Sequence, residues 1–112
     1  MKTIRTKTKL RVTQGSGNVF ADLGFRHPEQ ELLKARLVLQ IYRVIRERGL
    51  TQVEAGQILG VRQPHVSALM RGQSGLFSME RLIRFLTALG QDVEINVRQA
   101  RKQHGDLSVV LS

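Results

Sequence analysis

Residues 49–72 decide the fold, and they read Gly49-Leu-Thr-Gln-Val-Glu-Ala-Gly-Gln-Ile-Leu-Gly-Val-Arg-Gln-Pro-His-Val-Ser-Ala-Leu-Met-Arg-Gly72. Thr51, followed three residues later by Glu54, forms a capping box, which is the sequence signature of a helix start. Gly60 ends this helix, because the chain leaves it through a conformation that glycine adopts without strain. Pro64 fits the first turn of the next helix, where a backbone donor is not needed. The spacing predicts two short helices, at about residues 52–59 and 63–71, joined by a tight turn.

The apolar and small residues of this stretch agree with one packing geometry. Val66 and Leu69, three residues apart, form the inward face of the second short helix. Gly56, in the middle of the first, lets the two helices cross closely, although a glycine there costs about 0.5–1 kcal/mol relative to alanine. Two such helices form a helix-turn-helix motif, whose second helix enters the major groove of DNA.

The remaining side chains of the second helix suit contacts with DNA. Glutamine can pair with adenine and arginine with guanine, serine and histidine can bond to base edges, and alanine can touch a thymine methyl group. Polar groups near helix starts are better placed for phosphates. The alternative for each is an ordinary surface residue. The predicted DNA-binding residues are Gln52, Arg62, Gln63, His65, Ser67, Ala68 and Arg71.

Composition favours one small domain that binds a polyanion. The chain has 112 residues and a net charge of +9, and its length suits a single domain. Five basic residues precede the first acidic one, Asp22, and the C-terminal end is also basic, whereas the middle is nearly balanced. Basic ends favour nucleic acid as a partner. The alternative is that they only keep the protein soluble.

Several classes of function are excluded by what the sequence lacks. It has no cysteine, and no zinc-ligand pattern, phosphate-binding loop or nucleophile motif. We therefore expect no enzyme activity, no cofactor and no metal site. No stretch approaches the roughly 20 apolar residues of a membrane span, and no apolar run follows the basic N-terminus as in a secretory signal. We expect a soluble, cytoplasmic protein.

Apolar periodicity predicts two further helices and one strand. Leucine, isoleucine and valine recur every three or four residues between Pro28 and Gly49, and again between Ser78 and Gly90. Within 91–98, Val93, Ile95 and Val97 alternate with polar residues, which indicates a strand. Residues 109–111 could form a second short strand.

A single strand needs a partner for its backbone hydrogen bonds. The candidates are the same strand of a second copy, an intrachain hairpin with 107–111, or a partner protein. We favour pairing across the two-fold axis of a homodimer, with Val93, Ile95 and Val97 at the interface, because helix-turn-helix proteins commonly read two half-sites as dimers.

These elements predict a mainly α, four- to five-helix, lambda-repressor-like helix-turn-helix domain with a C-terminal β-strand used in dimerisation. The domain spans 20–90 and the dimerisation strand 91–98. Residues 1–19 form a flexible basic arm, because they are rich in Lys, Thr, Gly and Ser without apolar periodicity. Residues 99–112 form a basic tail.

The helix-turn-helix stretch and its flanks resemble the HigA class of Xre-type antitoxins. The resemblance covers about residues 17–98, and the segment before the first helix and the ending after Leu89 are its most specific parts. The stretches that carry it are Gly17-Asn-Val-Phe-Ala-Asp-Leu-Gly-Phe25, Gly49-Leu-Thr-Gln52, Gln63-Pro-His-Val-Ser67, Leu69-Met-Arg-Gly72, Phe77-Ser78 and Leu89-Gly-Gln-Asp-Val-Glu-Ile95. One departure is Gly56, where the family pattern more often has alanine.

The resemblance implies a dimeric protein that represses its own operon and neutralises a small basic toxin, a RelE/HigB-type mRNA endonuclease. Gln63, His65 and Ser67 would read the operator. Phe20, Leu23 and Phe25 would be apolar toxin-binding anchors, or alternatively would cover the protein's own core. Two other functions stay open: a stand-alone phage-type transcriptional repressor without a toxin, and an inhibitor that binds only protein.

Overall fold

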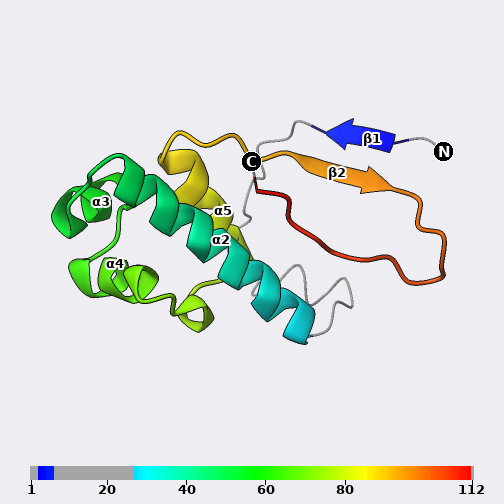
Figure 1. Cartoon of the computed structure of the whole chain (residues 1–112), viewed down its shortest axis with the longest axis horizontal. Helices are drawn as coiled ribbons and strands as arrows, with labels where there is room; N and C mark the ends of the chain where they lie inside the picture. The colour runs from blue at the N-terminus through cyan, green and yellow to red at the C-terminus, as the bar shows by residue number, and fades with distance from the viewer. Residues whose placement is uncertain (1–2, 7–26, 112) are drawn as a thin grey trace.

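The computed structural model describes residues 3–6 and 27–111. Within these residues the chain is mainly helical, as predicted, with α3 and α4 at one end of the molecule and a small sheet at the other (Figure 1). The elements in chain order are β1 (Thr3–Thr6), α2 (His27–Glu47), α3 (Gln52–Leu59), α4 (Gln63–Met70), the 3-10 turn η1 (Ser74–Leu76), α5 (Met79–Ala88) and β2 (Ile95–Arg98).

The four α-helices lie within one or two residues of their predicted bounds, and side chains cap the starts of α3 and α5. At the start of α5, the Ser78 hydroxyl accepts a hydrogen bond from the Arg81 N–H at 3.2 Å. Past its end, Arg48 Nη1 donates to the Leu89 carbonyl oxygen at 3.0 Å. A cation beside exposed helix carbonyls is favourable there, and it also ties the end of α2 to the end of α5.

The core lies between α2 and α5, with α3 and α4 closing one end. It is largely aliphatic, as the composition predicts, and Ile41, Val66 and Leu82 are completely buried. Two aromatic rings join it: Phe77 and Phe85 pack edge to face with ring centroids 5.7 Å apart. Phe77 ends a segment that reads as a Gly/Ser loop, yet it is only 2% exposed.

Within the chain, β2 pairs with a segment that was not among the three partners considered from the sequence. β2 pairs antiparallel with β1 of the same chain, with Ile4 opposite Val97. The expectation that 1–19 has no regular structure is therefore wrong for Thr3–Thr6. That short stretch contains isoleucine and two threonines, residue types that suit strands, and it satisfies backbone groups along one edge of β2.

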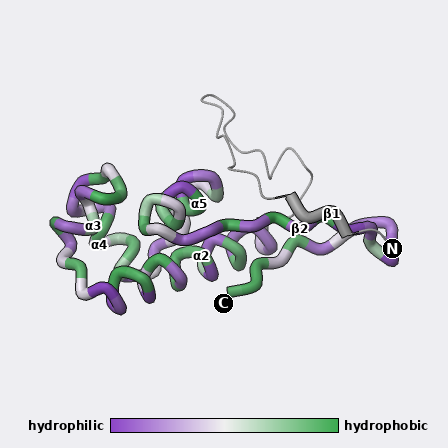
Figure 2. The backbone as a smooth tube through the Cα atoms, turned by 90° about the horizontal axis from the view of Figure 1, so that it is seen from above, coloured by the Kyte–Doolittle hydropathy of each residue, from purple (hydrophilic) through white to green (hydrophobic). Residues whose placement is uncertain are grey.

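The C-terminal segment packs on the helices without forming a strand, so the expected strand at 109–111 is not observed. Leu107 and Val109 pack against the core, whereas Val110 is 88% exposed. Arg36 Nη1 donates to the Val109 carbonyl oxygen at 3.4 Å. The apolar last residues therefore run back toward α2 (Figure 2), and the basic tail is anchored to the helices through Leu107 and Val109.

The crossing of α3 and α4 leaves no room for a side chain at Gly56. A Cβ atom built at Gly56 would lie 2.9 Å from the Val61 carbonyl oxygen and 3.4 Å from Val66 Cγ2. The first distance is shorter than real Cβ contacts, and the clashing atom belongs to the backbone of the turn. The close approach that the sequence predicts is present.

Replacing Gly56 with valine should lower the free energy of unfolding by about 1–3 kcal/mol, because the added methyl groups overpack the crossing. Urea denaturation followed by circular dichroism would measure the loss. Gln57→Val is the matched control, since Gln57 is an exposed neighbour in the same helix, and it should change stability by no more than about 0.5 kcal/mol. Equal stability of the two variants would contradict the close crossing.

Candidate nucleic-acid interface

The turn between α3 and α4 has the geometry that its glycine predicts. Gly60 has φ 70° and ψ 32°, in the left-handed region, and the Val61 N–H donates to the Gly56 carbonyl oxygen at 3.0 Å. At the start of α3, the Glu54 N–H donates to Thr51 Oγ1 at 3.1 Å and the Thr51 N–H donates to Glu54 Oε1 at 2.9 Å. The predicted capping box is confirmed.

The leading end of α4 faces outward. Val66 is completely buried and Leu69 is 1% exposed, so these two residues seat the helix on the core. Arg62, Gln63 and His65 are exposed at its start. An α-helix seated on one side by apolar residues and bare at its first turn is the shape that can enter a major groove.

The start of α4 is also electropositive. No side chain caps its N-terminus, and its first turn holds no acidic residue, whereas α3 has both a cap and Glu54. A helix N-terminus carries a partial positive charge that favours phosphates. The exposed guanidinium of Arg62, at the N-cap position, adds a full charge at the same place.

Side chains of α3 and α4 line a shallow concavity on this face. Gln52, the first residue of α3, is half-buried there and Gln57 is exposed. Three glutamines thus border one surface, and Gln57 is the one that sequence reasoning missed. Gln57 lies on α3, and only the close crossing at Gly56 brings it beside α4. The lining residues are Gln52, Val53, Gly56, Gln57, Gly60, Val61 and Gln63.

In the later part of α4, two of the predicted DNA-binding residues bond to each other and one lies in the core. Arg71 Nη1 donates to Ser67 Oγ at 2.8 Å, which holds the exposed arginine along the helix. Ala68 was expected on the outer face, but it is 2% exposed. Because α4 packs against α3, α2 and η1, its buried arc is wider than the one that Val66 and Leu69 define, and Ala68 falls within it.

The loop after α4 supports the start of the helix. The rings of His65 and Phe77 meet edge to face with centroids 6.2 Å apart. The Arg81 guanidinium lies 5.3 Å from the centroid of the same Phe77 ring, within the range of a cation–π interaction. His65 therefore rests on a buried aromatic ring that also contacts α5.

The other predicted site residues lie elsewhere on the described structure or outside the described residues. Phe20, Leu23 and Phe25 lie outside the described residues. Val93 packs against the core, and Val97 is 56% exposed. Within 27–111 and 3–6, no group of three or more histidine, cysteine or acidic side chains could hold a metal ion.

Comparison with known proteins identifies the family. A family model described as a helix-turn-helix domain matches residues 19–98. A solved structure described as an XRE family transcriptional regulator is 38% identical, with a TM-score of 0.72, over 78% of this chain and 100% of that one. The chain belongs to the XRE family of helix-turn-helix proteins. A comparison with curated proteins finds no match.

Membership of the XRE family agrees with the fold and with the exposed start of α4. The family and the fold are those of DNA-binding transcriptional regulators, which are not usually enzymes. In the described part of the chain, no helix has the length and apolar character needed to cross a membrane.

Removing the α3 cap with Thr51→Ala should lower the free energy of unfolding by about 1 kcal/mol at neutral pH. The backbone N–H and the hydroxyl of Thr51 lower the pKa of the Glu54 carboxyl. Because the folded-state pKa is depressed, the carboxylate's contribution is complete above its unfolded pKa and is lost as the pH falls through the folded value. Thr51→Ala keeps the backbone N–H and removes only the hydroxyl, so the difference between wild type and variant should shrink in acid by the hydroxyl's share alone.

Denaturant titrations at a series of pH values would measure this difference. Thr51→Ser keeps the hydroxyl acceptor and is the matched control, with nearly wild-type stability. A cost of Thr51→Ala that stays the same across the acid range would contradict the part assigned to Glu54.

Proposed function

We propose that this XRE-family protein is a sequence-specific repressor whose α4 enters the major groove of operator DNA. The observation that carries the proposal is the bare leading end of α4, where Gln63 and His65 are exposed while Val66 and Leu69 anchor the opposite side. The uncapped N-terminus beside Arg62 supports the same orientation toward phosphates.

Each polar side chain that the sequence predicted and the structure leaves accessible has a role in this proposal. Gln63 and His65 contact base edges, and glutamine is suited to adenine. Gln52 and Arg62, at the two helix starts, contact phosphates and set the position of α4 on the duplex. Arg71, held by Ser67, contacts the DNA farther along α4.

Two copies reading a two-fold symmetric operator form the second part of the proposal. Within the described residues β2 has one hydrogen-bonded neighbour, β1, and Val97 is 56% exposed. The proposed dimer interface therefore stays at Ile95 and Val97, through the second edge of β2, with Val93 just before the strand. β2 runs along the long axis of the molecule, at the end away from α4 (Figure 1), so antiparallel pairing of two such strands favours widely spaced half-sites.

The proposed second activity is neutralisation of a RelE/HigB-type mRNA endonuclease toxin. Its support is the sequence resemblance to the HigA class, carried by the segments before α2 and after α5. Phe20, Leu23 and Phe25 are the proposed toxin-binding residues, all outside the described residues. A stand-alone XRE repressor fits the family match and the similar solved structure equally well.

Gln63→Ala should weaken operator binding by about 1–3 kcal/mol and relax discrimination at one base pair. The operator would be selected from random duplexes with the wild-type protein, and affinities would be measured by filter binding at several salt concentrations. Binding should weaken steeply with salt, because several phosphates are neutralised. Gln99→Ala, at an exposed position after β2, is the control. Equal affinity for all duplexes before and after Gln63→Ala would argue against base readout.

Co-expression with a toxin encoded in the neighbouring reading frame would test neutralisation. The wild-type protein should restore growth, and the triple substitution of Phe20, Leu23 and Phe25 with alanine should abolish rescue, because it removes the apolar anchors. Operator binding by the triple variant should persist, and Gln63→Ala should still rescue. Absence of a toxic neighbour, with operator binding intact, would favour the stand-alone repressor.

A further inference from the structure

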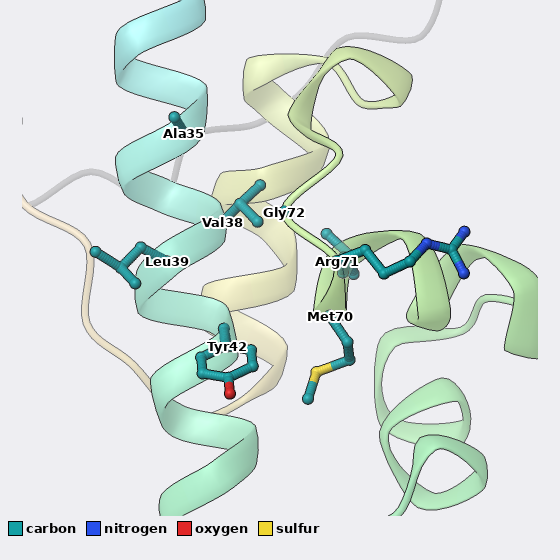
Figure 3. Close-up of a pocket in the computed structure, with 8 residues that line it drawn as sticks. Ala35, Val38, Leu39, Tyr42, Met70, Arg71 and Gly72 are labelled. Atoms are coloured by element: carbon teal, nitrogen blue, oxygen red, sulfur yellow. The ribbon is translucent and has the colours of Figure 1, made fainter.

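An apolar groove runs between the middle of α2 and the end of α4 (Figure 3). Leu39 is 43% exposed beside it, and Tyr42 and Met70 are half-buried in it. Leu32, one heptad before Leu39 on α2, is 61% exposed and continues the apolar stripe along the helix. The residues that line the groove are Ala35, Val38, Leu39, Tyr42, Leu69, Met70, Arg71 and Gly72.

Arginines outnumber acidic residues around this apolar surface, although Glu47, four residues after Arg43 on α2, is exposed. Arg71 lines the groove with its guanidinium directed away from α2 (Figure 3), and no acidic residue lines it. The Arg46 guanidinium lies 5.8 Å from the centroid of the Tyr42 ring. Arg43, four residues after Leu39 and therefore on the same side of α2, is exposed. The nearby Glu31 is paired with Lys34 at 3.4 Å. The groove thus combines an apolar floor with a positive rim.

This combination selects among three kinds of occupant. Duplex DNA would match the arginines but would leave the apolar floor without a complement. A second copy would bring the same positive rim against itself, in a chain with a net charge of +9. An amphipathic helix with apolar anchors and acidic flanks matches both features, as in helix-in-groove recognition.

We propose that the α2–α4 groove binds an acidic amphipathic helix of a partner protein, and that its occupancy weakens DNA binding. The second half rests on the proposed function. Arg71 lines the groove and also donates to Ser67 on the proposed DNA-binding face. If a carboxylate of the partner helix binds Arg71 at the groove, Arg71 can no longer contact the DNA. By thermodynamic linkage, bound DNA must weaken binding of the partner helix by the same factor.

The direct test uses the full-length protein without DNA and a fluorescein-labelled peptide of about five helical turns, with leucines on one face and glutamates on the other. Anisotropy should show binding that weakens with salt, because the rim contributes charge. Leu39→Ser should raise the Kd about tenfold, the loss expected for one apolar anchor. Arg46→Ala should weaken binding and flatten its salt dependence.

Val53→Ser is the matched control, because Val53 is 56% exposed on α3 and outside this groove. Its Kd should equal that of the wild type. A peptide with lysine in place of every glutamate should not bind. Equal binding by Leu39→Ser and wild type, or equal binding of the lysine peptide, would overturn the proposal. So would a dimer that Leu39→Ser dissociates while the glutamate peptide fails to bind, since the groove would then be a contact between copies.

Coupling is measured by repeating the operator titration with saturating glutamate peptide. The affinity for DNA should fall severalfold for the wild type and remain unchanged for Arg71→Ala, whose lower starting affinity already lacks the shared contact. An unchanged wild-type affinity would overturn the coupling. Peptide binding by a protein that binds no duplex would overturn the proposed function and leave the groove as a peptide site.

Discussion

The close crossing of α3 and α4 at Gly56 is the constraint on which the rest of the structure depends. A Cβ atom at Gly56 would lie 2.9 Å from the Val61 carbonyl oxygen of the turn and 3.4 Å from Val66 Cγ2 of α4, so the close packing of α4 on α3 requires glycine there. Val66 and Leu69 then fix its rotation, because both are buried. Rotating α4 by one residue, about 100°, would turn an apolar anchor toward water and draw the polar start of the helix toward the core.

Aromatic side chains outside α3 and α4 also support the start of α4 on its core side. Phe77 lies at the end of a loop whose other residues are mostly polar or glycine. Its ring is in the core, where it packs edge to face with Phe85 and with His65. Arg81 lies over both phenylalanine rings, at 5.3 and 5.4 Å from their centroids. The start of α4 is therefore braced by α3 through its backbone and by α5 through aromatic rings. Because these contacts hold α4 in place in the free protein, little conformational entropy is lost when it binds DNA.

Features fixed by interactions between residues close in sequence were predicted correctly, and features fixed by residues far apart in sequence were not. Thr51, Gly60 and Ser78 act on backbone groups within four residues, so their helix ends could be predicted. Ala68 could not be placed, because α4 also packs against α2 and η1, which come from elsewhere in the chain. The partner of β2 was missed for the same reason: Thr3–Thr6 is some ninety residues away, and period-two alternation identifies a strand but not its neighbour.

The amino-acid sequence by itself determined four helices, their caps, the glycine turn and an α4 with one apolar and one polar side, because these follow from propensity, capping and periodicity. The tertiary structure decided which polar residues share a surface. Gln57 joins Gln52 and Gln63 only because two helices cross closely, and the α2–α4 groove exists only because Leu39 and Tyr42 lie beside Met70. Such surfaces belong to pairs of elements, and no periodicity within one element specifies how far or at what angle another will pack.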